Sequence, residues 1–250
     1  MAIPFYLAIT PPEIAVIETL PGPLAWMGCH FSPNGPGLSE LPDRLPPGAM
    51  LTLNDALPIR GHDPDLILKQ LERTVTTLDC SCVLLDLQCP GSDEIASLVR
   101  HLADALPCPV GVSALYGTDL SCPVFLPPVP LDVSLEAHLC PWKGREIWLD
   151  VSGIGQTLSV TENGAASEPA AEYRAPESGF SDPALHIHYH MEIGEAARFH
   201  LFRTAEDQKA LLAEAKKHSV MKAVGIYQEL AAWNHTQTLY ETELCRKFHN

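Results

Sequence analysis

The sequence predicts one α/β domain over residues 1–250, built as an irregular TIM-type (β/α)8 barrel in which some helices are missing or short. The length of 250 residues suits a single barrel. Apolar runs of strand length alternate with amphipathic segments between residues 49 and 115. The alternation returns after residue 185, whereas several other connections lack a helical pattern. A doubly wound open sheet is the alternative fold.

Strand and helix patterns are clearest in the first half of the chain. Asp63 and Pro64 supply an N-cap and a first-turn proline for the first expected helix. The strands are nearly continuous apolar runs, which favours parallel pairing with the helices outside the sheet. The expected strands cover 49–55, 82–88 and 109–115, and the expected helices cover 64–78 and 92–106.

Further segments bring the number of expected strands to eight. A hairpin turn is expected at Gly194 and Glu195, and a helix is expected to open with a capping box between Thr204 and Asp207. The additional strands cover 24–30, 123–126, 146–152, 185–192 and 221–227, and 5–9 is an extra strand candidate.

Two segments interrupt the alternation of strands and helices. Residues 32–48 are rich in Pro and Gly, which predicts a long surface loop. Residues 163–183 are rich in Ala, Ser, Glu, Pro and Gly. Because strand patterns resume on both sides of 163–183, we expect a mobile insertion there and not a linker between domains.

Composition and charge argue against several classes of function. A net charge of −15 and a pI near 5.0 disfavour binding to nucleic acid or to an anionic membrane surface. The chain shows neither a basic targeting start nor an apolar run near the roughly 20 residues of a membrane span. We therefore expect a cytoplasmic protein whose eight cysteines are reduced. No motif indicates a cofactor.

The expected strand at 82–88 has polar side chains only at one end of one face. Alternation along a strand places Cys82, Leu84, Asp86 and Gln88 on the same face. In a parallel barrel the working residues lie where the strands end. Asp86 and Gln88 are therefore candidate ligand-binding residues.

Residues 81–88 resemble the fourth barrel strand of the family-18 glycoside hydrolases, the chitinase type, whose motif reads Asp-Gly-x-Asp-x-Asp-x-Glu. Asp86 matches the last Asp of the motif, which in the family orients the acetamido group of the substrate. Gln88 replaces the Glu that donates the proton, and Leu84 replaces the middle Asp. The resemblance implies a carbohydrate site without its usual acid, because an amide cannot act as a general acid.

Other polar residues are expected near strand ends in the same barrel. Asn54, Asp55, Tyr116 and Glu229 complete the predicted ligand-binding set with Asp86 and Gln88. Two alternatives remain for this set. The residues either cap strand ends without binding a ligand, or belong to an active site that uses a different acid.

The run from His186 to Glu192 alternates three histidines and a glutamate on one strand face. The favoured interpretation is a polar face satisfied by hydrogen bonds, with no metal bound. Same-face residues on a strand are about 7 Å apart, so one ion needs help from another strand to bridge two of them. The alternative is a metal site formed by His188, His190 and Glu192.

Three functional hypotheses follow from these patterns. The first is a glycoside-hydrolase-like barrel that binds a carbohydrate or glycan fragment and lacks the family's catalysis. The second is a metal-assisted hydrolase that uses the strand from His186 to Glu192. The third is a partner-binding protein whose pocket is vestigial.

Overall fold

The computed structural model describes residues 3–57, 59, 61–90, 92–161, 164–170, 179–194 and 197–232. Eight parallel strands close into a barrel, because the first strand pairs with both the second and the last. Around the barrel they are β1 (Phe5–Ile9), β2 (Leu24–Phe31), β4 (Met50–Asn54), β5 (Cys82–Asp86), β6 (Val110–Ser113), β7 (Val124–Leu126), β8 (Ile147–Asp150) and β14 (Val220–Ile226). The predicted irregular TIM-type barrel is confirmed.

Two of the segments expected as strands have a different role from the one predicted. The segment 5–9, expected only as an extra strand, is the barrel strand β1, and all five of its residues are buried. The segment 185–192, counted toward the eight, forms β12 (Ile187–Ile193) of a second, antiparallel sheet. The sequence pattern of β12 is polar on one face, as expected for a strand covered on one side only.

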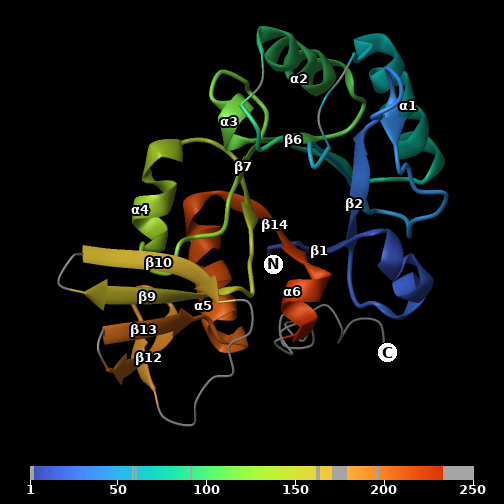
Figure 1. The fold of residues 1–250 in the computed structure, drawn as a ribbon. Coiled ribbons are helices and arrows are strands. Elements are labelled where there is room, and N and C mark those ends of the chain that lie inside the picture. Colours follow the sequence, from blue (N-terminus) through green and yellow to red (C-terminus); the bar gives the residue numbers. More distant parts are fainter. Residues whose placement is uncertain are drawn as a thin grey trace.

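The predicted strand–helix–strand units of the first half are confirmed. Strands β5 and β6 are parallel neighbours. Helices α1 (Pro64–Thr77) and α2 (Asp93–Ala105) lie outside them (Figure 1). Asp63 caps α1 by accepting hydrogen bonds from two backbone N–H groups of its first turn.

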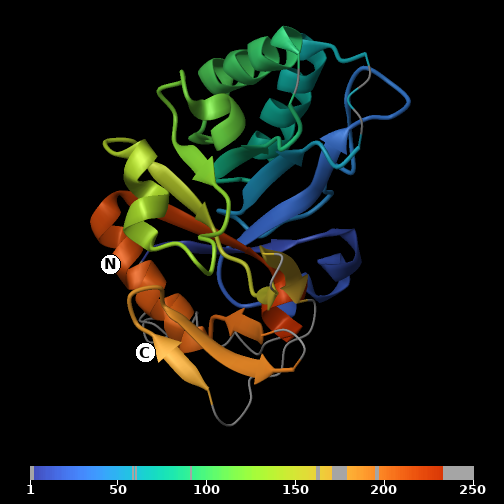
Figure 2. The same ribbon diagram turned by 60° about the vertical axis from the view of Figure 1, so that its left-hand side comes forward.

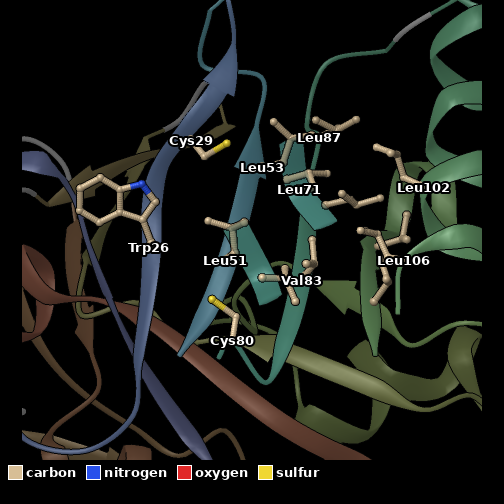
Figure 3. Close-up of a cluster of buried hydrophobic side chains, with 14 of the residues drawn as sticks. Trp26, Cys29, Leu51, Leu53, Leu71, Cys80, Val83, Leu87, Leu102 and Leu106 are labelled. Atoms are coloured by element: carbon tan, nitrogen blue, oxygen red, sulfur yellow. The ribbon is translucent and has the colours of Figure 1, made fainter. Parts of the chain in front are cut away.

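The two faces of the barrel strands pack into different cores. On β5, Cys82 and Leu84 belong to the cluster inside the barrel, whereas Val83 and Leu85 belong to the cluster between the strands and the helices. Figure 3 shows this outer cluster, in which Val83 lies near the helical side chains. The buried outer residues labelled there include Leu51, Leu53, Leu71 and Leu102.

Several outer helices are short or replaced by turns. The connection from β1 to β2 is the 3-10 helix η1 (Pro11–Thr19), and the range 32–48 contains only the short strand β3 (Leu38–Ser39), antiparallel to β2. After β6 and β7 the chain forms α3 (Ala114–Gly117), α4 (Leu135–Leu139) and η2 (Cys140–Trp142). After β14 it forms α6 (Tyr227–Ala232).

A five-stranded antiparallel sheet is inserted between β8 and the helix that precedes β14. Its strands, in spatial order, are β10 (Gly164–Ala170), β9 (Gly155–Thr161), β13 (Ala197–Phe202), β12 and β11 (Phe180–Asp182). Figures 1 and 2 show it beside α5 (Ala205–Ala215), which continues into η3 (Lys216–His218). The range 163–183 contains β10 and β11, while residues 163 and 171–178 and the expected turn residue Glu195 lie outside the described part of the chain.

Two further observations concern the whole described chain. The seven cysteines among the described residues are free thiols. No helix in the described ranges has both the length and the apolar character needed to cross a bilayer.

Candidate functional site

Three carboxyl groups come together at the C-terminal mouth of the barrel. Asp86 ends β5, Asp150 ends β8, and Glu229 lies in the first turn of α6, directly after β14. The charges of Asp86 and Glu229 both act on Asp150. Strand ends of a closed barrel collect residues from distant parts of a sequence, and here they collect acids that interact electrostatically.

The Asp150 carboxyl of this cluster has a strongly raised pKa. Burial raises the pKa of the Asp150 carboxyl to about 8, and the charges of Asp86 and Glu229 add to the effect. The backbone N–H of Val151 donates to Asp150 Oδ1 over 2.8 Å and partly opposes the shift. A neutral carboxylic acid at the barrel mouth can donate a hydrogen bond or a proton.

Sequence reasoning missed Asp150, although this residue lies within the expected strand at 146–152. The signal that could have found Asp150 is the alternation of side chains along a strand, which also identified Asp86. Trp148 is fully buried inside the barrel, and Asp150 follows it on the same face at the strand end. No sequence motif marks Asp150, and its neighbours in the cluster come from β5 and α6.

Asp86 and Gln88 are in direct contact, although β5 ends at Asp86 and Gln88 lies two residues beyond the strand that was expected to include it. Gln88 Nε2 donates a hydrogen bond to Asp86 Oδ1. Burial raises the pKa of Asp86, the hydrogen bond from Gln88 acts in the opposite direction, and the charge of Asp55 raises it further. Gln88 is exposed and Asp86 is half-buried, so a ligand at the mouth has access to both side chains.

Asn54 and Asp55 lie beside this pair but use their polar atoms on the protein backbone. Asn54 Nδ2 donates to the carbonyl of Met27 over 2.6 Å, and Asn54 Oδ1 accepts the backbone N–H two residues later over 3.1 Å. The Asp55 carboxylate accepts the backbone N–H groups of Gln88, over 3.0 and 3.1 Å, and of Cys89, over 2.7 Å. Asp55 thereby holds the loop after β5 in place, whereas Asn54 ties the end of β4 to β2.

Tyr116 faces a pocket to the side of the carboxyl cluster. Its hydroxyl donates to the carbonyl of Cys89 over 2.8 Å. The pocket has a volume of about 320 Å³, and its lining includes Tyr116, Asp55 and Cys89 but neither Asp150 nor Glu229. Of the predicted ligand-binding residues, Asp86 and Glu229 thus belong to the carboxyl cluster, whereas Asp55 and Tyr116 line this pocket.

Glu229 is held at the mouth by a chain of hydrogen bonds. Ser152 Oγ donates to Glu229 Oε2 over 2.6 Å, and Gln208 Nε2 of α5 donates to the carbonyl of Ser152 over 2.8 Å. The chain ties the end of β8 to both α5 and α6. The predicted placement of Glu229 near the end of the last strand is therefore observed, with the residue on a helix instead of the strand.

The barrel interior below the carboxyl groups is filled by side chains. The Trp148 ring is fully buried, and Lys222 Nζ lies 4.8 Å from its centroid. The same ammonium group lies 3.3 Å from Cys82 Sγ and 3.4 Å from the Tyr6 hydroxyl. Small barrels are packed in this way, so a ligand approaches Asp86 and Asp150 from the mouth.

The histidine strand forms a different grouping from the predicted alternative of His188, His190 and Glu192. His188 Nδ1 lies 2.7 Å from Asp207 Oδ2 on α5, away from the other two. His200 on the neighbouring strand β13 joins His190 and Glu192, and one ligand atom from each lies within 4.8 Å of the others. Sequence reasoning missed His200, because only strand pairing brings it opposite His190.

No protein-family model matches the chain, and no curated protein matches it. Solved structures of glycoside hydrolases do match its fold. A class V chitinase from Nicotiana tobaccum has a TM-score of 0.62 at 8% identity, over 96% of this chain and 99% of that chain.

A glycoside hydrolase family 18 N-acetylglucosaminidase from Paenibacillus barengoltzii has a TM-score of 0.60 at 10% identity, over 95% of this chain and 99% of that chain. The spore cortex-lytic enzyme SleL of Bacillus cereus has a TM-score of 0.60 at 10% identity, over 94% of this chain and 74% of that chain. The chain therefore has the fold of the chitinase-type barrel. At these identities the likeness establishes the fold and leaves the function to the site.

Proposed function

We propose that the chain binds a carbohydrate or glycan fragment at the barrel mouth and lacks the proton donor of the chitinase-type mechanism. The observation that carries the proposal is the contact between Gln88 and Asp86 at the end of β5. Counted from β1, β5 is the fourth strand of the barrel, which is the strand that bears the family motif. In the resemblance to that motif, Gln88 takes the place of the acid and Asp86 that of the last Asp.

Two further features support a sugar as the ligand. The exposed amide of Gln88 and the half-buried carboxyl of Asp86 suit hydroxyl and acetamido groups, which both donate and accept hydrogen bonds. A glutamate-to-glutamine variant of the tobacco chitinase was solved in complex with NAG4. That protein shares the fold of this chain at a TM-score of 0.62, so NAG4 is a reasonable first probe.

The test is calorimetric titration of the full chain with NAG4, together with a hydrolysis assay on the same sugar. We expect binding without turnover in the wild type. Asp86→Ala should weaken binding by about 1–3 kcal/mol, the range for losing a charged hydrogen-bond partner. Asp119→Ala, which removes an exposed carboxylate after α3, is the control and should bind as the wild type does.

Gln88→Glu extends the test to catalysis. The restored acid should produce at most a trace of hydrolysis, because Leu84 replaces the carboxylate that stands two residues before Asp86 in the family motif. Robust wild-type turnover that survives Asp86→Ala would contradict the proposal, since β5 would then not be the working strand.

A second candidate function is hydrolysis in which Asp150 replaces the missing acid. The observation in its favour is the protonated carboxyl of Asp150, with a pKa of about 8, beside two further carboxyl groups. A positioned general acid contributes about 10² to 10⁴ in rate. This candidate requires turnover that falls as the pH rises through about 8 and that is lost in Asp150→Asn.

A further inference from the structure

The outer half of the β12–β13 hairpin brings together two imidazoles and one carboxylate. In the antiparallel register His190 lies opposite His200, and their ring centroids are 4.9 Å apart. Glu192 lies two residues beyond His190 on the same strand face. One nitrogen or oxygen atom from each of the three residues lies within 4.8 Å of the others.

The spacing around Glu192 matches the span of a metal coordination shell. His190 Nε2 lies 3.4 Å from Glu192 Oε1, and His200 Nε2 lies 3.6 Å from Glu192 Oε2. Ligands bound to zinc at about 2.1 Å with tetrahedral angles are separated by about 3.4 Å. Each imidazole therefore lies near one oxygen of the same carboxylate at about the distance found between two ligands of one ion, and the three ligand atoms have to move closer together from their separations of up to 4.8 Å.

His200 is oriented by a partner behind it. Its Nδ1 atom lies 3.1 Å from the Thr157 hydroxyl on β9, which is its cross-strand neighbour on the other side. An Nδ1–H that donates to Thr157 leaves the Nε2 lone pair directed at Glu192, and histidines that bind metals are commonly held in this way. Thr157 is buried, so the ring orientation is set by the sheet.

The other two histidines, His186 just before β12 and His188 within it, are engaged elsewhere. His186 Nε2 lies 2.8 Å from Glu214, and His188 Nδ1 lies 2.7 Å from Asp207, both on α5. The histidine face therefore divides into an inner half that contacts α5 and an outer half that faces His200. His188 provides a matched control on the same strand.

We propose that His190, Glu192 and His200 bind a divalent transition metal of the zinc class. Two imidazoles and one carboxylate suit zinc and disfavour magnesium and calcium, which prefer oxygen ligands. The side chains of His190, His200 and Glu192 are 25%, 17% and 58% exposed, which leaves a fourth position open to water. The ion would cross-link β12 to β13 at the outer end of the hairpin.

The experiment is zinc titration of the chelator-treated full chain, with the thiols blocked so that exposed Cys89 and Cys140 do not compete. We expect one zinc per chain, with affinity at least tenfold lower in His200→Ala and in Glu192→Gln. His188→Ala should bind zinc as the wild type does. The melting temperature should rise with zinc in the wild type and in His188→Ala only.

A second variant tests whether any loss of zinc binding comes from the missing ligand and not from unfolding. His190→Gln keeps a polar side chain of similar length, and circular dichroism should show an unchanged sheet while zinc binding falls at least tenfold. Absence of zinc binding in the folded wild type would overturn the proposal. It would also be overturned if His200→Ala bound as the wild type does, or if His188→Ala lost zinc to the same extent.

Discussion

Asp150 shows how the environment of one residue in this barrel sets its protonation state. The carboxyl lies at the mouth of a closed barrel, above the buried Trp148 ring and beside two other acids. Loss of water around the group and repulsion from its neighbours both favour the neutral form. The same residue at an exposed strand end would be ionised at neutral pH.

The raised pKa of Asp150 makes a prediction for stability. The unfolded carboxyl ionises near pH 4, whereas the folded carboxyl ionises near pH 8. Between these values the folded state holds the extra proton, so the stability contributed by Asp150 is fully present below pH 4 and falls as the pH rises toward 8.

Asp150→Asn should therefore flatten the pH dependence of stability between pH 4 and 8. At pH 8 the variant should gain at least about 1.4 kcal/mol over the wild type, the free energy of one pKa unit. Urea denaturation at several pH values measures this difference. An unchanged pH profile would show that the folded Asp150 titrates near its ordinary pKa.

At the scale of single elements, two helix starts differ in how their caps are made. Thr204 accepts the N–H of Asp207, and the Asp207 carboxylate accepts the backbone N–H and the hydroxyl of Thr204. The predicted capping box at α5 is confirmed. Ser92 stands at the same position before α2 but makes no side-chain cap hydrogen bond.

Thr204→Ala should destabilise the protein by about 1 kcal/mol, since a helix N–H loses its partner and Asp207 loses its orientation. Ser92→Ala is the matched control and should cost less, because no capping bond is lost. Thermal denaturation of the two variants compares them directly. Equal costs would mean that the capping contacts of α5 contribute little.

Strand β6 contains a glycine that the barrel interior requires. A Cβ atom on Gly111 would lie 2.6 Å from Cζ3 of the buried Trp148 ring. Gly111→Ala should therefore destabilise the protein by about 1–3 kcal/mol, the usual cost of overpacking a core. At Gly194 a Cβ atom meets no heavy atom within 4 Å, so Gly194→Ala should be nearly neutral in the same denaturation experiment.

For the whole molecule, one buried arginine joins the inserted sheet to the barrel. Arg203 follows β13, and its guanidinium donates to the carbonyls of Val129 over 2.6 Å and of Pro130 over 3.2 Å in the segment after β7. It also donates to Leu185 before β12 over 3.3 Å. Burial lowers the pKa of Arg203 to about 10, so the side chain remains charged at neutral pH.

Arg203→Ala should cost at least about 2 kcal/mol, because the buried carbonyl of Val129 and the partly buried carbonyls of Pro130 and Leu185 lose their donor together. Arg198→Ala, on the exposed part of β13, is the control and should change stability by less than about 0.5 kcal/mol. If both variants unfolded at the same urea concentration, the contact between sheet and barrel would not be held by Arg203.

The sequence by itself determined the local elements and the class of fold. Apolar periodicity located β5, β6, α1 and α2 and placed Asp86 at a strand end, because these patterns depend only on neighbouring residues. Local patterns did not separate barrel strands from strands of another sheet. For that reason the sequence pattern indicates only an extra strand at β1, which is a barrel strand, and it indicates a barrel strand at β12, which belongs to the second sheet.

Only the tertiary structure decided which side chains meet. Barrel closure brings Asp150 and Glu229 to Asp86 from elements far apart in the sequence, and the pairing of β12 with β13 brings His200 to His190. The tertiary structure also shows that Asn54 and Asp55 bond to backbone groups, which their position at a strand end does not reveal. The physical reason is that charge coupling and shared ligands depend on distances across strands, whereas a linear pattern records only distances along one strand.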